Sequence, residues 1–526
     1  MTEGSNVFGR YRQWVRRGLL EICPYEEKEL GSKTGKIVFI SFSAAVLGAG
    51  TVLLVNGSDL FTFLAMVFIA YIMLREIPEF LLTKKRNEFY AILPAYLSAV
   101  RRKYVSLGNI PEAVKEAAAG MEKEIRLNAK EICEILMLGN RREPVREYAG
   151  KGIRDRFMKL FLIQAYEASE FGDGKGEKES SVFAENMEIL RNGIANERYS
   201  SRKTAFMFSG YMTVSVLPVL VFGVIKRAGL SFSGDLIEFY EGKGKLVLLA
   251  ALLTSFFIYR MISDAGSDGR KKGLGYGRKT EGKIAGKLEC NKGAVCNLIR
   301  RLISETDPDD TVAGTVLEMV MAMAVPTVIG IASGAAMLPG GKFALGVMSM
   351  ISGIMPVIEL LYRQERSNKL MIEEIKRMQM VIMMERKLES ITVVALLSDL
   401  ELFANAFGSE IRECLNTWSE GPEEALKVLK KKGGKKNAYF NAIAEGFLAV
   451  DEVGLEEAFS DTISDRDSME KFEELENDIR TEKRRDLTDI MAWIPGAVML
   501  GGYFIIPFLK LTLGEMEELF KMLESF

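Results

Sequence analysis

The chain has no histidine, and among its 526 residues there are only 5 cysteines, 3 tryptophans and 13 prolines. Histidine is the commonest general base and metal ligand, so its absence excludes Ser–His–Asp and Cys–His catalytic arrangements. The cysteines show neither a disulfide framework nor paired metal-ligand spacing; they are Cys23, Cys133, Cys290, Cys296 and Cys414. We therefore expect a protein that is not an enzyme, with no catalytic residue, no bound metal and no cofactor.

Nucleotide-binding motifs are also missing. The segments "GSKTGK" and "GDGKGEKES" depart from the spacing GxxxxGK[ST], and neither follows a predicted strand. The acidic segment after Asp451 is typical of solvated helix faces, not of paired catalytic carboxylates. The chain should not hydrolyse ATP by itself. The formal net charge of −2 says nothing about nucleic acid, because the local charge pattern matters more. We expect no nucleic-acid partner.

Hydrophobic and charged residues, 48% and 27% of the chain, are segregated along the sequence. Apolar segments of about 20 residues are long enough to cross about 30 Å of hydrocarbon. Seven such spans are predicted, at 36–56, 59–75, 205–225, 245–262, 313–338, 343–362 and 490–510. The sequence therefore predicts an all-α, polytopic membrane protein embedded in a lipid bilayer.

Two long charge-rich segments separate the spans, and both show helical rather than strand periodicity. In "GPEEALKVLKK", Pro422 suits a helix start, and Ala425, Leu426 and Leu429 then fall on one face. The segment "NIPEAVKEAA" (109–118) has the same pattern. Each long segment is predicted to form an amphipathic helical bundle.

Lysine and arginine accumulate in cytoplasmic loops, and this rule orients the chain. The segment after the fourth span is densely basic, whereas the C-terminal tail is acidic. The predicted order is a cytoplasmic N-terminal segment (1–35), transmembrane helices 1–2 (36–76), a first cytoplasmic bundle (84–203), transmembrane helices 3–4 (205–262), a basic cytoplasmic linker (263–312), transmembrane helices 5–6 (313–362), a second cytoplasmic bundle (363–487), transmembrane helix 7 (490–512) and an external acidic tail (513–526).

The spacing of glycines predicts an internal duplication. Gly139 and Gly172 are 33 residues apart, and so are Gly421 and Gly454. The shift of 282 residues between the pairs also carries the first span onto 318–338. The repeated unit is span, span, bundle, span, which has an odd number of crossings. The additional span at 245–262 restores the parity that places both bundles on one side.

Three segments resemble the bundle motifs of the type II secretion system F domain. They are "GNIPEAVKEAA" (108–118), "GNRREPVREYA" (139–149) and "GPEEALKVLKK" (421–431). The motif glycines, to which we assign a structural role, are Gly108, Gly139, Gly172, Gly421 and Gly454. The segment "SITVVALLSDL" departs from the pattern, because Ser390 stands where glycine is usual. The chain is most similar to the tight-adherence pilus and archaeal-type branches, with two F domains in one chain.

The resemblance implies a platform protein in the inner (plasma) membrane of a type IV pilus-like or type II secretion machine. Such a platform has no active site. It binds a cytoplasmic assembly ATPase through its bundles and pilin or pseudopilin subunits through its membrane part, and a homo-oligomer is compatible with this role. The alternative is a polytopic transporter or channel with regulatory bundles. Pro326, Pro356 and Pro495 favour the alternative, whereas the near absence of charge inside the spans opposes it.

The parity argument predicts the side of the membrane on which three positions lie. In a cysteine-free background, Ser231→Cys should react with an impermeant maleimide from outside the cell. Gly275→Cys and Ser419→Cys should react only after the membrane is permeabilised, because the basic linker and the second bundle are expected inside. Labelling of both inner positions in intact cells would contradict the predicted topology.

Overall fold

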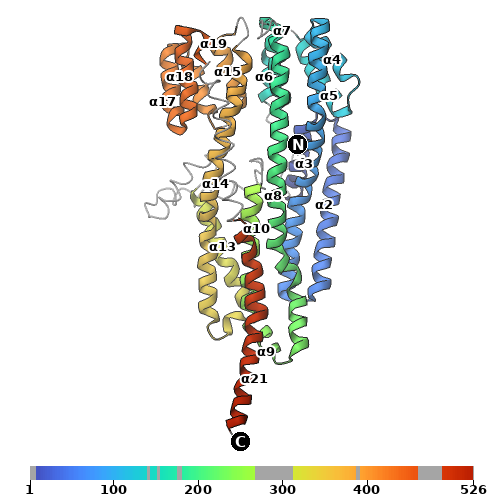
Figure 1. The fold of residues 1–526 in the computed structure, drawn as a ribbon, viewed down its shortest axis with the longest axis vertical. Helices are drawn as coiled ribbons and strands as arrows, with labels where there is room; N and C mark the ends of the chain where they lie inside the picture. Colours follow the sequence, from blue (N-terminus) through green and yellow to red (C-terminus); the bar gives the residue numbers. More distant parts are fainter. Residues whose placement is uncertain are drawn as a thin grey trace. The chain divides into compact units, whose positions relative to one another are not determined.

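The computed structural model describes residues 7–138, 142–150, 155–173, 181–266, 312–386, 391–404, 406–459 and 488–524. Every secondary-structure element of these residues is a helix (Figure 1). The all-α prediction is therefore confirmed. The basic linker predicted at 263–312, the motif glycine Gly139 and Ser390 lie wholly or almost wholly outside the described residues.

Among the described residues, seven helices are long and apolar enough to cross a membrane. They are Glu27–Asn56, Leu60–Leu107, Gly210–Phe232, Gly244–Ser263, Thr315–Ala332, Gly341–Ile358 and Thr488–Leu523. Each predicted span falls on one of them, which confirms the seven-span prediction. The chain is a polytopic helical membrane protein.

The helices follow one another with short connections in the parts that the structure describes. In chain order they are α1 (Val7–Ile22), α2 (Glu27–Asn56), α3 (Leu60–Leu107), α4 (Ile110–Ala118), α5 (Lys123–Met137), α6 (Arg142–Gly150), α7 (Arg156–Phe171), α8 (Val182–Phe232), α9 (Leu236–Glu241), α10 (Gly244–Gly266), α13 (Val312–Ala332), η2 (Ala335–Met337), α14 (Gly341–Glu385), α15 (Val393–Phe403), α16 (Gly408–Thr417), α17 (Pro422–Lys436), α18 (Ala438–Val453), α19 (Leu455–Ala458), η3 (Val498–Ile505) and α21 (Ile506–Glu524).

The chain forms two compact units. The bundle unit consists of Met1–Phe39, Ile77–Ser201 and Lys369–Asp478, and the span unit consists of Ile40–Glu76, Arg202–Asn368 and Ile479–Phe526. Both predicted bundles belong to the bundle unit. Helices α2, α3, α8 and α14 each contribute residues to both units without a break in the helix.

Helix α4 shows how local sequence builds the first bundle. The Asn109 side chain accepts a hydrogen bond from the Glu112 backbone N–H at 3.1 Å and so caps the helix, while Pro111 occupies its first turn. Its buried residues are Ile110, Ala113, Val114, Ala117 and Ala118, which recur at helical spacing. The apolar face predicted for this segment is therefore confirmed.

Helices α7 and α18 have the same design in the two bundles. Both contain 16 residues. Asp155 caps α7 by accepting from Phe157 N at 3.0 Å, and Asn437 caps α18 by accepting from Tyr439 N at 2.8 Å. Asn437 follows Asp155 by the same 282 residues that separate the predicted repeats. Buried positions also correspond at this shift: Met158, Phe161, Leu162 and Ala165 in α7 match Phe440, Ile443, Ala444 and Phe447 in α18.

Both helices end at a glycine with positive φ. Gly172 has φ 86° and ψ 157°, and Gly454 has φ 84° and ψ 163°. This is not the left-handed helical conformation common after helices, because ψ is far larger. It belongs to a region of backbone space that is essentially restricted to glycine. Helix termination at these two positions therefore depends on the missing Cβ.

Helix α10, which covers the additional span, lies in the core of the span unit. Half of its apolar window is buried, the largest share among the seven candidate spans. The rings of Phe256 and Tyr259 pack on Phe68 of α3 at 5.5 and 5.9 Å. Leu248 and Leu249 share a buried cluster with residues of the π-helical segment η3. Helix α10 thus joins α3 to the last span in addition to crossing the membrane.

An N-terminal helix is the element that the sequence analysis missed. In α1, Tyr11, Val15, Leu19 and Ile22 are all buried at helical spacing. The Asn128 side chain of α5 donates a hydrogen bond to the Ile22 carbonyl at 3.1 Å. The sequence gives little sign of this helix, because its buried residues are spread over successive turns among basic and polar residues and form no long apolar run.

The glycine geometry predicts selective destabilisation. Gly172→Ala and Gly454→Ala should each cost about 1–3 kcal/mol of local stability, since the added Cβ forces a strained backbone. A Cβ at either position meets no atom within 4 Å, so strain is the only penalty. The measurement is amide hydrogen exchange of α7 and α18 in the purified full chain.

Gly120→Ala is the matched control. Gly120 also has open space around its missing Cβ, but its φ is not positive. The control should change protection by only a few tenths of a kcal/mol. Equal effects of all three substitutions would show that Gly172 and Gly454 are ordinary connecting residues.

Candidate functional site

The structure places the motif glycines at separate helix ends. Gly108 follows α3 with φ +68°, and its N–H donates to the Tyr104 carbonyl at 2.8 Å. Gly421 precedes α17 with φ 164°, an extended conformation open to any residue. With Gly172 and Gly454, the described motif glycines lie at the ends of four different helices. They lie at the turns where these helices begin or end.

A surface groove does occur on the first bundle, between α4 and α5. Its volume is about 400 Å³. The lining residues are Lys115, Ala118, Ala119, Arg126, Ala129, Lys130, Cys133, Glu134 and Met137. Three alanines, one cysteine and one methionine provide apolar surface, and the remaining four residues are ionisable. The groove thus has an apolar floor and a charged rim.

Small side chains explain why the groove exists. Where α4 and α5 meet, Ala118 and Ala129 are buried but fill little space. The Cys133 thiol donates a hydrogen bond to the Pro111 carbonyl at 3.5 Å, and so it links the two helices at one end of the groove. Larger residues at the alanine positions would fill this space. The run of alanines in "KEAAA" (115–119), together with Ala129 of α5, is thus the sequence feature that leaves this space open.

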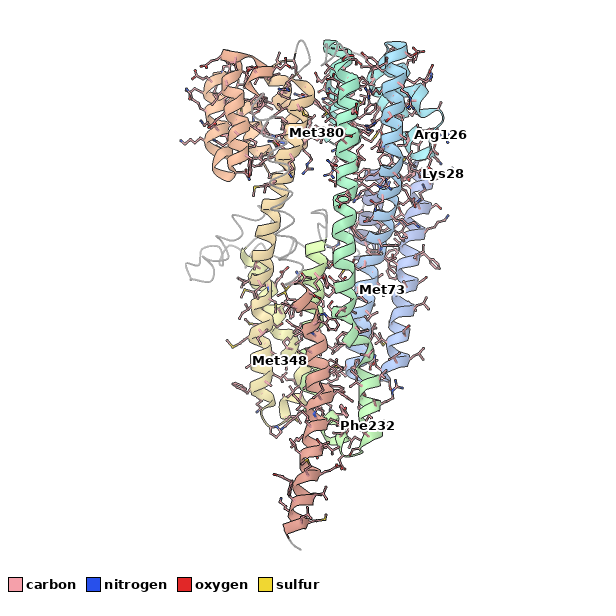
Figure 2. The ribbon with its side chains drawn as sticks, in the orientation of Figure 1. Lys28, Met73, Arg126, Phe232, Met348 and Met380 are labelled. Carbon is pink, nitrogen blue, oxygen red and sulfur yellow. The ribbon has the colours of Figure 1, made fainter. Side chains whose placement is uncertain are left out.

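The rim of the groove is positively charged. The lining has three basic residues and one acidic residue: Lys115, Arg126, Lys130 and Glu134. Lys130 Nζ lies 3.9 Å from a Glu134 carboxylate oxygen, and both side chains are about two-thirds exposed or more, so this pair contributes little energy. Arg126 is labelled on the first bundle in Figure 2. The ionisable side chains of the groove therefore carry a net positive charge.

The groove cysteine is not poised for nucleophilic chemistry. Burial raises the pKa of the Cys133 thiol; nearby Lys115 lowers it and Glu134 raises it further. Burial also raises the pKa of Cys414 in the second bundle, to about 11. Reactive cysteines have depressed pKa values instead. Within the described residues, no three Cys, Asp or Glu side chains converge as a metal site would require.

A buried polar junction joins the two bundles inside the bundle unit. Asn186 of α8 donates to the Gln164 side chain at 2.7 Å and to the Met384 carbonyl at 2.9 Å. Gln164 of α7 in turn donates to the Glu385 carboxylate at 3.0 Å. Met380, labelled in Figure 2, approaches Gly193 of α8 so closely that an added Cβ would lie 2.9 Å from its methyl carbon. These contacts make the two bundles one body.

Sequence reasoning could not have found this junction. Gln164 and Asn186 are about 200 positions from Met384 and Glu385, and each alone is an ordinary polar residue on a helix. The one sign of burial in the sequence was an apolar neighbourhood, as for Gln164 within "FLIQAY". A buried amide needs a hydrogen-bond partner, but the sequence does not name it.

Comparison of the chain with protein-family models, curated proteins and solved structures finds no match. The class of the protein therefore follows from its own geometry. It is a polytopic helical membrane protein whose two helical bundles are joined in one compact unit.

The raised thiol pKa predicts slow alkylation of Cys133. In a variant that retains Cys133 alone, iodoacetamide labelling should be slow at pH 7. It should accelerate about tenfold per pH unit up to the pKa, because only the thiolate reacts. The measurement is the labelling rate between pH 7 and pH 11 in the purified protein.

Leu138→Cys in a cysteine-free background is the control, because Leu138 lies next to the end of α5 and is 61% exposed. Its labelling should level off near pH 8.5, the ordinary thiol pKa. The same pH profile for both thiols would contradict the burial of Cys133. Unfolding in denaturant should make the two rates equal.

Proposed function

We propose that the chain is an inner-membrane platform protein of a type IV pilus-like or type II secretion machine. Both bundles lie on the cytoplasmic side in this proposal. They engage an assembly ATPase, while the spans engage pilin or pseudopilin subunits. The observation that carries the proposal is the matched pair α7 and α18, since it supports two F domains in one chain.

The support for duplication comes from features that packing alone does not require. Asp155 precedes Gly172 by 17 residues, as Asn437 precedes Gly454, and each pair brackets a helix of 16 residues. The order α2 to α7 is matched by the order α13 to α18, with η2 in the short turn of the second set. Unrelated bundles have no physical reason to repeat an N-cap, a helix length and a glycine-only terminus.

Continuous helices suit a mechanical coupling role. Helices α3, α8 and α14 pass from the bundle unit into the span unit with no intervening loop. A helix transmits displacement better than a flexible linker does, because its backbone is hydrogen-bonded along its whole length. A conformational change of the ATPase acting on the bundles would thereby reach the spans. The buried junction between the bundles would make them move together.

The α4–α5 groove is the proposed contact for the ATPase. Its apolar floor fits an amphipathic segment, and its three cations favour acidic residues at the margin of that segment. Rim charges act mainly on association rate and specificity. Binding should therefore weaken as ionic strength rises.

One observation favours the alternative of a transporter. The Glu76 carboxylate accepts hydrogen bonds from Tyr259 at 2.7 Å and from Ser263 at 2.9 Å within the span unit. Ionisable residues inside membrane proteins often mark transport pathways. Glu76, however, is the last residue of its segment in the span unit, where the hydrophobic stretch ends. A structural link between α3 and α10 accounts for its contacts.

The proposal predicts co-purification of an ATPase. The tagged full chain, cross-linked in native membranes, should retain an ATPase that hydrolyses nucleotide, whereas the purified chain alone should not. Lys115→Glu with Lys130→Glu should reduce recovery of the ATPase about tenfold or more, equivalent to about 1.4 kcal/mol. Lys84→Glu is the control, because Lys84 is exposed on α3 but does not line the groove.

Two outcomes would contradict this proposal. Hydrolysis by the isolated chain that survives removal of contaminating ATPases would exclude a passive platform. Solute uptake by proteoliposomes that contain only this chain, together with no ATPase in the cross-linked complex, would establish the transporter.

A further inference from the structure

The last helix, α21, has a long exposed apolar stripe. Its members are each at least half exposed: Ile506, Leu509, Leu513, Met516, Phe520 and Leu523. We name these six residues the α21 stripe. Their spacing along the chain alternates between three and four residues. This spacing is the pattern by which helices pair in coiled coils.

The opposite side of the same helix is already occupied by its own chain. Phe508 and Leu511 pack against the core of the span unit. The Phe508 ring lies 5.2 Å from the ring of Phe232, which is labelled in Figure 2. These contacts fix the rotation of α21. They leave the α21 stripe directed away from the rest of the span unit.

The second half of α21 extends past the membrane. The last candidate span, Thr488–Leu523, has 36 residues and is about 50 Å long, whereas the hydrocarbon layer is about 30 Å thick. Residues 515–524 include four glutamates and one lysine, which excludes that part from hydrocarbon. Figure 1 shows the end of α21 extending beyond α9. Lipid tails therefore do not cover Met516, Phe520 and Leu523.

The stripe keeps one register from the membrane part into the aqueous part. Ile506 and Leu509 lie in the first turns of α21, and the same three–four spacing continues through Leu513 to Leu523. The helix is unbroken at Gly514. If the aqueous part folded onto the membrane surface, its apolar residues would not need to lie on the same side of the helix as Ile506 and Leu509. Its glutamates would also be repelled by anionic headgroups.

We propose that a second copy of this chain covers the α21 stripe, with the two α21 helices parallel. Copies inserted in one membrane share their orientation, so a symmetric pair places the same stripe on both helices face to face. With stripe residues at the a and d positions, Glu517 takes an e position opposite Thr512 of the second copy. No like charges meet across the contact between the two α21 stripes. The inference does not depend on the proposed function.

The contact between the two α21 helices is short, and anchoring in one membrane compensates for its low stability. Eighteen residues from Ile506 to Leu523 are fewer than three heptads, and such a pair is marginal in solution. Anchoring in one bilayer raises the effective concentration of the partner helix and removes most of its orientational freedom. We therefore expect pairing in membranes and little pairing of the isolated segment.

The test is cysteine cross-linking of the full chain in its membrane. In a cysteine-free background, Met516→Cys and Phe520→Cys should each form a disulfide-linked dimer under mild oxidation, because facing seam positions come within disulfide reach. Glu518→Cys lies on the opposite side of the helix and should cross-link at least about tenfold less. Leu513→Glu combined with Met516→Cys should abolish the dimer while the protein stays in the membrane fraction.

The remaining outcomes would overturn the inference, and they distinguish other occupants. If no cross-link forms and the thiols react with an impermeant maleimide, the α21 stripe is not covered by any molecule. Absent cross-links with protected thiols would show cover by the bilayer or by another protein. Equal cross-linking at Glu518→Cys would indicate random collision. None of these results requires an ATPase or a filament subunit, so this test is separate from that of the proposed function.

Discussion

The requirement that backbone polar groups be satisfied inside hydrocarbon governs this protein. An unpaired backbone N–H or C=O in lipid costs several kcal/mol, so each span must be a helix. Once a span is helical, extending it into water avoids a new helix end with its unsatisfied groups. Helices α3, α8 and α14 follow this course and enter the bundle unit without interruption. The same helices therefore contribute residues to both units.

The same constraint explains how polar side chains are tolerated in the span unit. Ser352 donates to the Ala322 carbonyl at 2.6 Å, and Ser349 donates to the Met323 carbonyl at 2.6 Å, which ties α14 to α13. Glu76 is held by two hydroxyl groups from α10. Each of these three side chains finds its partner on a neighbouring helix, and such a bond offsets the cost of burying a polar group away from water. Polar contacts thus specify helix pairing where the hydrophobic effect is absent.

Association between helices follows a different rule in the bundle unit. Water drives apolar faces together there, and residues such as Val114 and Phe161 are completely buried. The polar junction of Gln164, Asn186 and Glu385 makes the packing more specific, since a buried amide tolerates few alternative packings. The α4–α5 groove and the α21 stripe are two places where apolar surface stays uncovered. Both are accordingly candidates for contact with other molecules.

The sequence by itself determined the seven spans, the apolar face of α4 and the helix ends at Gly172 and Gly454. These features depend on local properties: the length of an apolar run, helical periodicity and the backbone freedom of glycine. Only the tertiary structure decided that α10 joins α3 to the last span, that α1 packs on α5, and that Gln164 pairs with Glu385. The reason is physical. These contacts join residues far apart in the chain, and many partners are chemically equivalent until packing selects one.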